Sequence, residues 1–164
     1  MSDKLIGELN SAFDVYDQKK QESIAIAEKK KTDHEIYLEN FKSVCDEVIK
    51  PTMEELGQAI EKRGHKYKIT SRLESEDHQG RITPANIQLE IYPDGDQPDY
   101  VNKNFPHLSF VAGAYDNNTY THVSTMMPKR GGMSGKRNDY KLAEITPEVV
   151  KKEVVHIVTS CFGK

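Results

Sequence analysis

The chain has 164 residues, of which 30% are charged, and a formal net charge of −3 at pH 7. This length suits one domain with an appended arm, and the net negative charge argues against a protein that binds nucleic acid over its whole surface. No apolar run reaches the roughly 20 residues of a membrane span, and the N-terminus lacks the apolar core of a signal peptide. We therefore expect no membrane partner and a cytoplasmic location.

Residues 3–31 carry the pattern of an amphipathic helix. Such a helix would be about 40 Å long, which is more than a small domain needs. Its apolar stripe is thin and is interrupted at residues 19–21, so we predict a helical arm at residues 1–32 that packs on a second helix or a second subunit, as in a coiled-coil homodimer. The stripe consists of Leu5, Leu9, Ala12, Phe13, Tyr16, Ile24 and Ala27.

A second helix is predicted from Thr32-Asp33, which offers an N-cap, to Gly64, a typical helix stop. Because the apolar phase crosses Pro51 without a slip, the pattern favours one kinked helix over a fresh helix that begins at Pro51. Its apolar positions are Ile36, Leu38, Phe41, Val44, Cys45, Val48, Ile49, Met53, Leu56 and Ile60.

After Gly64 the apolar period changes to two, which is the period of a strand. Strands are predicted at residues 65–74, 85–92, 107–115 and 119–127. Thr146 and Pro147 then supply the N-cap and first position of a last helix. Short linkers between the strands predict a four-stranded antiparallel meander with helices on one face, an α+β fold, in a single domain of residues 33–164.

Asn117 and Asn118 are predicted to form a two-residue hairpin turn, because asparagine tolerates positive φ. The apolar side of this hairpin would then pair Ala114 with Thr121, Ala112 with Val123, Phe110 with Thr125 and Leu108 with Met127. The other side would pair Tyr115 with Tyr120, Gly113 with His122, Val111 with Ser124 and Ser109 with Met126. A glycine beside a histidine leaves a hollow, so we expect a ligand or partner on this second side.

The sequence "MMPKRGGMSGKR" at residues 126–137 follows the fourth predicted strand. Residues 129–141 hold five Lys/Arg against one Asp, a net charge of +4, whereas residues 1–64 hold ten Lys/Arg against fourteen Asp/Glu, a net charge of −4. The spacing fits neither a Walker A motif nor a dinucleotide fingerprint. Glycines still allow backbone N–H groups to approach an anion, with which the basic side chains would pair. A solvated loop is the alternative interpretation.

We therefore predict a ligand-binding set from this segment and the adjoining sheet side. Its members are Lys129, Arg130, Gly131, Gly132, Ser134, Gly135, Lys136, Arg137, His122, Tyr115 and Tyr120.

No catalytic residue, metal site or cofactor site is predicted. His122 and Ser124 share a strand face, but β-carbons two residues apart on a strand lie about 7 Å apart, which is long for a nucleophile and its base. The six histidines lack the spacing of a metal site. Cys45 and Cys161 occupy apolar helix positions, typical of packed, reduced thiols.

The sequence thus predicts a non-enzymatic binding module that self-associates and whose basic segment contacts an acidic protein or a phosphate-containing ligand, with nucleic acid less favoured. The alternative is a hydrolase or transferase that acts on a phosphorylated small molecule through His122 and the basic segment. A carboxylate within hydrogen-bond reach of His122 at the mouth of a pocket would favour this enzyme.

Overall fold

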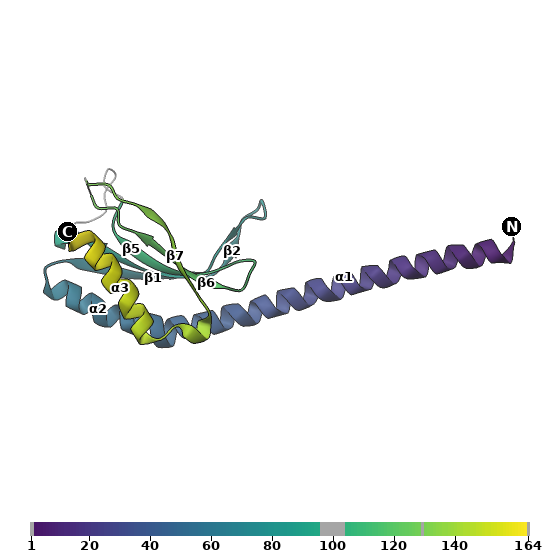
Figure 1. Cartoon of the computed structure of the whole chain (residues 1–164), viewed down its shortest axis with the longest axis horizontal. Coiled ribbons are helices and arrows are strands. Elements are labelled where there is room, and N and C mark those ends of the chain that lie inside the picture. Colours follow the sequence, from purple (N-terminus) through teal and green to yellow (C-terminus); the bar gives the residue numbers. More distant parts are fainter. Residues whose placement is uncertain (1, 96–103, 129, 164) are drawn as a thin grey trace. The chain divides into compact units, whose positions relative to one another are not determined.

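The computed structural model describes residues 2–95, 104–128 and 130–163 (Figure 1). Its helices are α1 (Asp3–Val44), α2 (Lys50–Lys62) and α3 (Pro147–Phe162), with a π-helical turn at Cys45–Ile49 between the first two. Its strands are β1 (Lys66–Arg72), β2 (Ser75–Glu76), β3 (Ile82–Thr83), β4 (Asn86–Tyr92), β5 (His107–Ala112), β6 (Thr119–Ser124) and β7 (Ser134–Tyr140). The chain divides into two compact units, Met1–Ile36 and Tyr37–Lys164. The α+β class is confirmed, but several details of the prediction are wrong.

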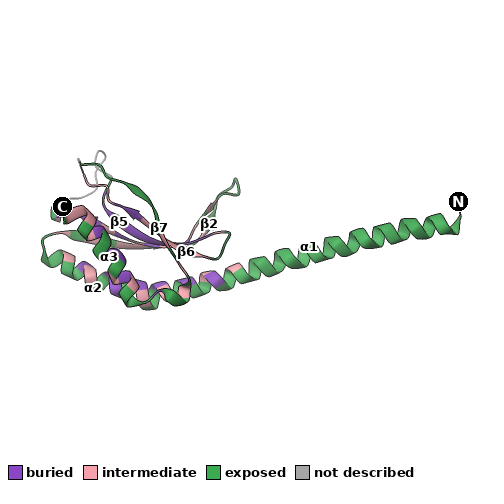
Figure 2. Ribbon diagram, in the orientation of Figure 1, coloured by how far each residue is buried: buried purple, intermediate pink, exposed green. Residues whose placement is uncertain are grey.

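The first helix is longer than the sequence predicts. Helix α1 runs through Lys31 and Thr32 without a break, where the sequence predicts a boundary. The hydroxyl of Thr32 donates to the carbonyl of Glu28, four residues earlier, at 3.0 Å. Threonine can satisfy its hydroxyl within a helix in this way, so its presence does not require a cap. Residues 2–33 are all exposed (Figure 2).

The helix also continues through Pro51, which lies in the first turn of α2. Proline lacks an N–H and cannot make the usual helical hydrogen bond. The π turn just before it accommodates this loss, since the N–H of Lys50 reaches back to the carbonyl of Cys45. The hydroxyl of Thr52 donates to the carbonyl of Val48 at 2.7 Å. The proline therefore changes the helical hydrogen-bond pattern without ending the helix.

The main sheet has five antiparallel strands in the order β1-β4-β5-β6-β7, and β2 pairs with β3 in a separate two-stranded sheet. The four predicted strands are present as β1, β4, β5 and β6. The fifth, β7, was missed because "SGKRNDY" contains neither an apolar alternation nor β-branched residues.

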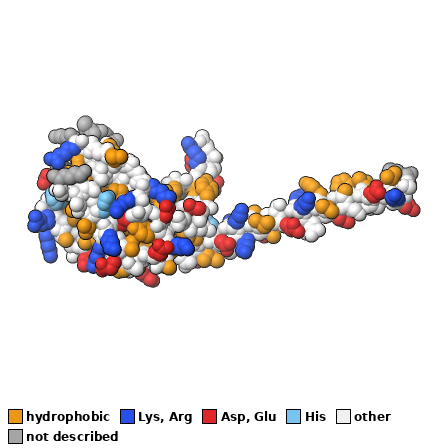
Figure 3. All heavy atoms as spheres, in the orientation of Figure 1, with side chains coloured by type: hydrophobic (Ala, Val, Ile, Leu, Met, Phe, Trp, Pro, Cys, Tyr) orange, Lys and Arg blue, Asp and Glu red, His pale blue; other side chains and the backbone are white. Residues whose placement is uncertain are grey.

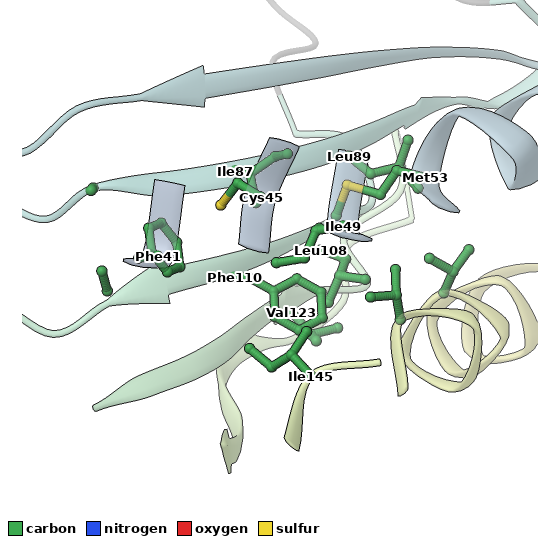
Figure 4. Packing of buried hydrophobic residues seen from close by; sticks show 14 of the residues in the cluster. Phe41, Cys45, Ile49, Met53, Ile87, Leu89, Leu108, Phe110, Val123 and Ile145 are labelled. Carbon is green, nitrogen blue, oxygen red and sulfur yellow. The ribbon is translucent and has the colours of Figure 1, made fainter. Parts of the chain in front are cut away.

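Alternate residues of β4, β5 and β6 build the core. Figure 4 shows Phe41, Cys45, Ile49 and Met53 from the helical segment packed against these strands. The strand residues in this contact include Ile87, Leu89, Leu108, Phe110 and Val123, and α3 adds Val150, Val154 and Ile157. One face of the sheet is thus covered by helices, as the sequence predicts.

The predicted hairpin faces are right, but the register is wrong by four residues. Ala112 pairs with Thr119, Phe110 with Thr121, Leu108 with Val123, Val111 with Tyr120 and Ser109 with His122. The turn is longer than two residues, because the N–H of Gly113 bonds the carbonyl of Asn118 at 2.8 Å and the carboxylate of Asp116 accepts from the N–H of Asn118 at 3.1 Å. Asn117 does adopt the expected positive φ, 51°. A side chain at position 113 would collide with Asp116 and Asn118, so this turn requires glycine.

Candidate ligand-binding site

The candidate site lies on the side of the main sheet that the helices leave uncovered, here called the open face. Its side chains come from alternate strand positions. They are Lys68, Thr70 and Arg72 of β1, Asn86, Gln88 and Glu90 of β4, His107, Ser109 and Val111 of β5, Tyr120, His122 and Ser124 of β6, and Lys136 and Asp139 of β7. The register aligns one row across all five strands, Thr70–Gln88–Ser109–His122–Lys136.

A hollow of about 360 Å³ opens on this face. Ser109 and Val111 form its floor and are only 4% and 9% exposed, although no helix covers them. The lining residues are Thr70, Arg72, Pro84, Asn86, Gln88, His107, Ser109, Val111, Tyr120 and His122. The size lies at the lower end of the range for small-molecule sites.

Hydrogen bonds fix the orientation of polar side chains in the hollow. The hydroxyl of Ser109 donates to Oε1 of Gln88 at 3.0 Å, and the amide of Asn86 donates to the carbonyl of Pro84 at 3.3 Å. Both amide side chains are therefore oriented before any ligand arrives. A ligand would meet preset polar groups and would not have to order them.

Two imidazole rings lie side by side in the hollow. His107 and His122 stack with ring centroids 5.6 Å apart and planes 14° apart. Burial lowers the pKa of His107, and the neighbouring His122 acts in the same direction, while the carbonyl of Phe105 and the carboxylate of Glu90 oppose the change. His107 is thus kept neutral near pH 7. Its Nδ1 lies 3.3 Å from the carbonyl of Phe105, to which it can only donate, so Nε2 of the neutral ring is an acceptor.

The basic segment is only partly a loop. Ser134, Gly135, Lys136 and Arg137 belong to β7, and a bridge between Met127 and Gly131 closes a tight turn ahead of the strand. Lys129 lies outside the described residues. The turn uses backbone N–H groups internally, since Met127 donates to Gly131 and Arg130 donates to Met127. A side chain at Gly132 would meet the backbone of Thr125 and Met126, so this glycine allows two chain segments to approach each other.

Lys136 and Arg137 pair with different carboxylates. Nζ of Lys136 lies 2.7 Å from the carboxylate of Asp139 and 5.3 Å from the centre of the Tyr120 ring, at the edge of the open face. Nε of Arg137 lies 3.7 Å from the buried carboxylate of Glu153 on α3. The two charges therefore do not converge on one anion.

The other predicted site residues also lie in separate places. Tyr120 and His122 line the hollow, whereas Tyr115 lies in the β5–β6 turn and is 85% exposed. Sequence reasoning did not select the remaining lining residues, above all Arg72, Asn86, Gln88, His107 and Ser109. The sequence signal that could have identified several of these residues is the run of polar side chains at alternate positions of β1 and β4.

The geometry does not favour nucleophilic catalysis. Ser109 is the cross-strand neighbour of His122, but its proton goes to Gln88. Among the described residues, no carboxylate hydrogen-bonds to His122. Within the described ranges, no group of three or more His, Cys, Asp or Glu side chains is arranged to hold a metal ion.

Comparisons with protein-family models, with curated proteins and with solved structures return no match to this chain. Among the described residues, no helix combines the length and apolar character needed to cross a membrane. The geometry of the chain itself therefore carries the functional interpretation.

Proposed function

We propose that this protein is a non-enzymatic binding module that holds a small phosphate-bearing ligand on the open face of its sheet. The observation that carries this proposal is the hollow of about 360 Å³ with a hydrogen-bonded polar floor. Ordered amides, two imidazoles and an aromatic ring converge there. Convergent polar groups in a concave site are typical of small-molecule recognition.

The charges around the hollow favour an anionic group on the ligand. Lys68 and Arg72 belong to β1 at one edge of the sheet, and Lys136 belongs to β7 at the other. Of the two carboxylates that the described strands place on this face, Asp139 is paired with Lys136, and Glu90 lies opposite Lys68 and accepts a hydrogen bond from Tyr92. Arg72 lines the hollow, and a guanidinium matches the geometry of phosphate oxygens.

The position of Tyr120 favours a ligand that also carries a flat or apolar part. Arg72, Asn86, Val111 and Tyr120 form one cross-strand row, with the two long side chains at its ends and the shorter ones between them. Adjacent strands lie about 4.8 Å apart, so the row spans about 14 Å between its end strands. A phosphate near Arg72 and a base or sugar near Tyr120 fit this span.

We also propose that the protein self-associates through residues 3–31. This segment is helical and exposes large apolar side chains, including Leu9 at 54%, Phe13 at 58% and Tyr16 at 62% exposure (Figure 3). Helices in water gain most of their stability by packing an apolar face. A partner that covers this stripe would supply that packing.

The ligand proposal is tested by thermal unfolding of the full chain with inorganic phosphate, glucose 6-phosphate or AMP. A ligand at a hundredfold excess over its dissociation constant stabilises the folded state by about 2.7 kcal/mol, so AMP should raise the unfolding temperature. The Arg72→Ala and Gln88→Leu variants should bind AMP at least tenfold more weakly. Arg63→Ala removes an arginine from the end of α2 and serves as the matched control.

Two outcomes would count against the proposal. The first is an unfolding temperature that none of the three probes changes. The second is an equal loss of AMP binding in Arg63→Ala and Arg72→Ala, because binding would then depend on net charge and not on the hollow.

A further inference from the structure

The N-terminal helix carries an apolar stripe in the unit Met1–Ile36. Positions separated by three, four or seven residues lie on the same face of a helix. Ile6, Leu9, Phe13, Tyr16 and Ile24 follow this spacing and are between 43% and 62% exposed. Ala27 extends the stripe and Lys20 interrupts it.

The same helix is divided by charge at its middle. Residues 3–17 hold four carboxylates, Asp3, Glu8, Asp14 and Asp17, against Lys4, a net charge of −3. Residues 18–31 hold five lysines, Lys19, Lys20, Lys29, Lys30 and Lys31, against Glu22 and Glu28, a net charge of +3. The helix is therefore electrostatically complementary to a reversed copy of itself.

We propose that residues 3–31 pair with the same residues of a second copy in antiparallel orientation and cross it near Tyr16 and Asp17. The pairing rests on the self-association included in the proposed function and adds its partner segment, orientation and register. Each acidic half then lies beside a basic half. Electrostatic complementarity of this kind selects orientation and excludes wrong pairings more than it adds affinity.

The apolar stripe supports the same register. With the crossing point at Tyr16 and Asp17, Leu9 faces Ile24 of the second copy and Ile6 faces its Ala27. Apolar side chains then meet on both sides of the crossing, which is the arrangement of a helical seam.

The interrupting lysine also fits an antiparallel pair. In this register Lys20 faces Phe13 of the second copy, and an ammonium group over an aromatic ring is a favourable cation–π contact. A parallel pair in register would place Lys20 against Lys20 in the middle of the seam. It would also set two halves of charge −3 side by side. Both effects disfavour the parallel arrangement.

Disulfide trapping tests this orientation in the full chain. One protein carries Leu9→Cys and the other Ile24→Cys, both with Cys161→Ser to remove the half-buried native thiol. The Cys161→Ser protein without an added cysteine is the matched control. Static light scattering on the same samples before oxidation reports the molar mass, and oxidation is followed on non-reducing gels.

The antiparallel pair predicts a dimer by light scattering and a cross-link in the mixture of the two variants. Each variant alone should cross-link at least tenfold less, since positions 9 and 24 do not face their own copies. Cross-linking within each variant alone would show a parallel pair and overturn the orientation while leaving self-association intact. A dimer that fails to cross-link in the mixture would overturn the register, and a monomer at tens of micromolar would overturn the pairing together with the self-association.

Discussion

Ser109 on β5 and His122 on β6 are direct cross-strand partners, yet the hydroxyl proton of Ser109 goes to Gln88 on β4. A serine activated for nucleophilic attack would instead donate to its base. We therefore expect no covalent adduct on Ser109 when the protein is treated with a fluorophosphonate probe and digested for mass spectrometry. An adduct on Ser109 that disappears in His122→Ala would support the enzyme interpretation over the binding module.

Because Phe110 belongs to the core, Phe110→Ala should strongly lower the free energy of unfolding. Phe110 is completely buried between the helices and the sheet, so truncation removes apolar contacts and leaves a cavity. Losses of this type amount to about 3–5 kcal/mol, which urea unfolding would detect as a lower midpoint. Tyr115→Ala removes an aromatic ring that is 85% exposed and should change stability by less than about 0.5 kcal/mol. Equal stability of the two variants would contradict the assignment.

The two thiols should differ in reactivity. Burial raises the pKa of Cys45 to about 12, with a smaller contribution from Asp46, whereas Cys161 is half-buried on α3. At pH 8 about one Cys45 side chain in ten thousand is the reactive thiolate. Ellman's reagent should therefore label one thiol per folded chain quickly and the second only after unfolding. Fast labelling of two thiols in the folded protein would show that Cys45 is accessible.

The lowered pKa of His107 predicts a loss of stability in mild acid. Below the ordinary pKa of 6.5 the unfolded chain takes up a proton on His107 more readily than the folded chain, so stability falls with pH. Burial and the nearby ring of His122 resist the proton, and Glu90 partly offsets them. The urea midpoint should drop between pH 7.5 and 5.5, and His107→Gln should reduce this drop. His78→Gln replaces an exposed histidine and should leave it unchanged.

Short-range patterns explain the elements that the sequence predicts correctly. The last helix begins where expected because the hydroxyl of Thr146 accepts from the N–H of Val149 at 3.3 Å and Pro147 occupies the first turn. The four apolar strands follow from alternation, which depends on one buried face. Such signals lie within a few neighbouring residues and need no knowledge of the tertiary structure.

The errors arise where local signals are ambiguous or absent. Thr32 has the side chain of a helix cap but bonds within the helix, and residues 134–140 form a strand without apolar alternation. The hairpin register depends on the carboxylate of Asp116, which favours a longer turn than the two asparagines suggest. The helix boundary, the last strand and the hairpin register each depend on contacts between particular atoms, which a pattern of residue types does not reveal.

The residues of the candidate site are harder still to predict from the sequence. Thr70, Gln88, Ser109 and His122 lie between 13 and 21 residues apart in successive strands and meet only because the register aligns them. The sequence predicts a hollow on the side of the hairpin that carries His122, and the observed hollow lies on that side. However, a serine and not a glycine lies opposite His122. The basic segment is conspicuous in the sequence because two Lys-Arg pairs lie within nine residues, but the structure pairs Lys136 and Arg137 with separate carboxylates.

Reversing charge on one half of the N-terminal helix should weaken self-association. In the antiparallel register Lys19 faces Asp14 of the second copy and Lys30 faces its Asp3, so Lys19→Glu with Lys30→Glu replaces attraction by repulsion. Surface pairs contribute about 0.2–1 kcal/mol each, and four such pairs per dimer predict a dissociation constant at least tenfold higher, measured by sedimentation velocity in 50 mM salt. The loss should shrink in 0.5 M salt, because screening weakens exposed charges.

Two further variants separate this effect from net charge. Lys42→Glu with Lys62→Glu makes the same change in net charge outside residues 3–31 and should leave the dissociation constant within about twofold of the parent. Adding Asp3→Lys and Asp14→Lys to the Lys19→Glu, Lys30→Glu protein exchanges the signs of both partners and should recover most of the lost affinity. Because this combined variant retains the apolar stripe and Lys20, failure to recover would mean that Asp3 and Asp14 do not face these lysines. An equal effect in the Lys42, Lys62 control would mean that general repulsion, and not the pairing of opposite halves, governs the association.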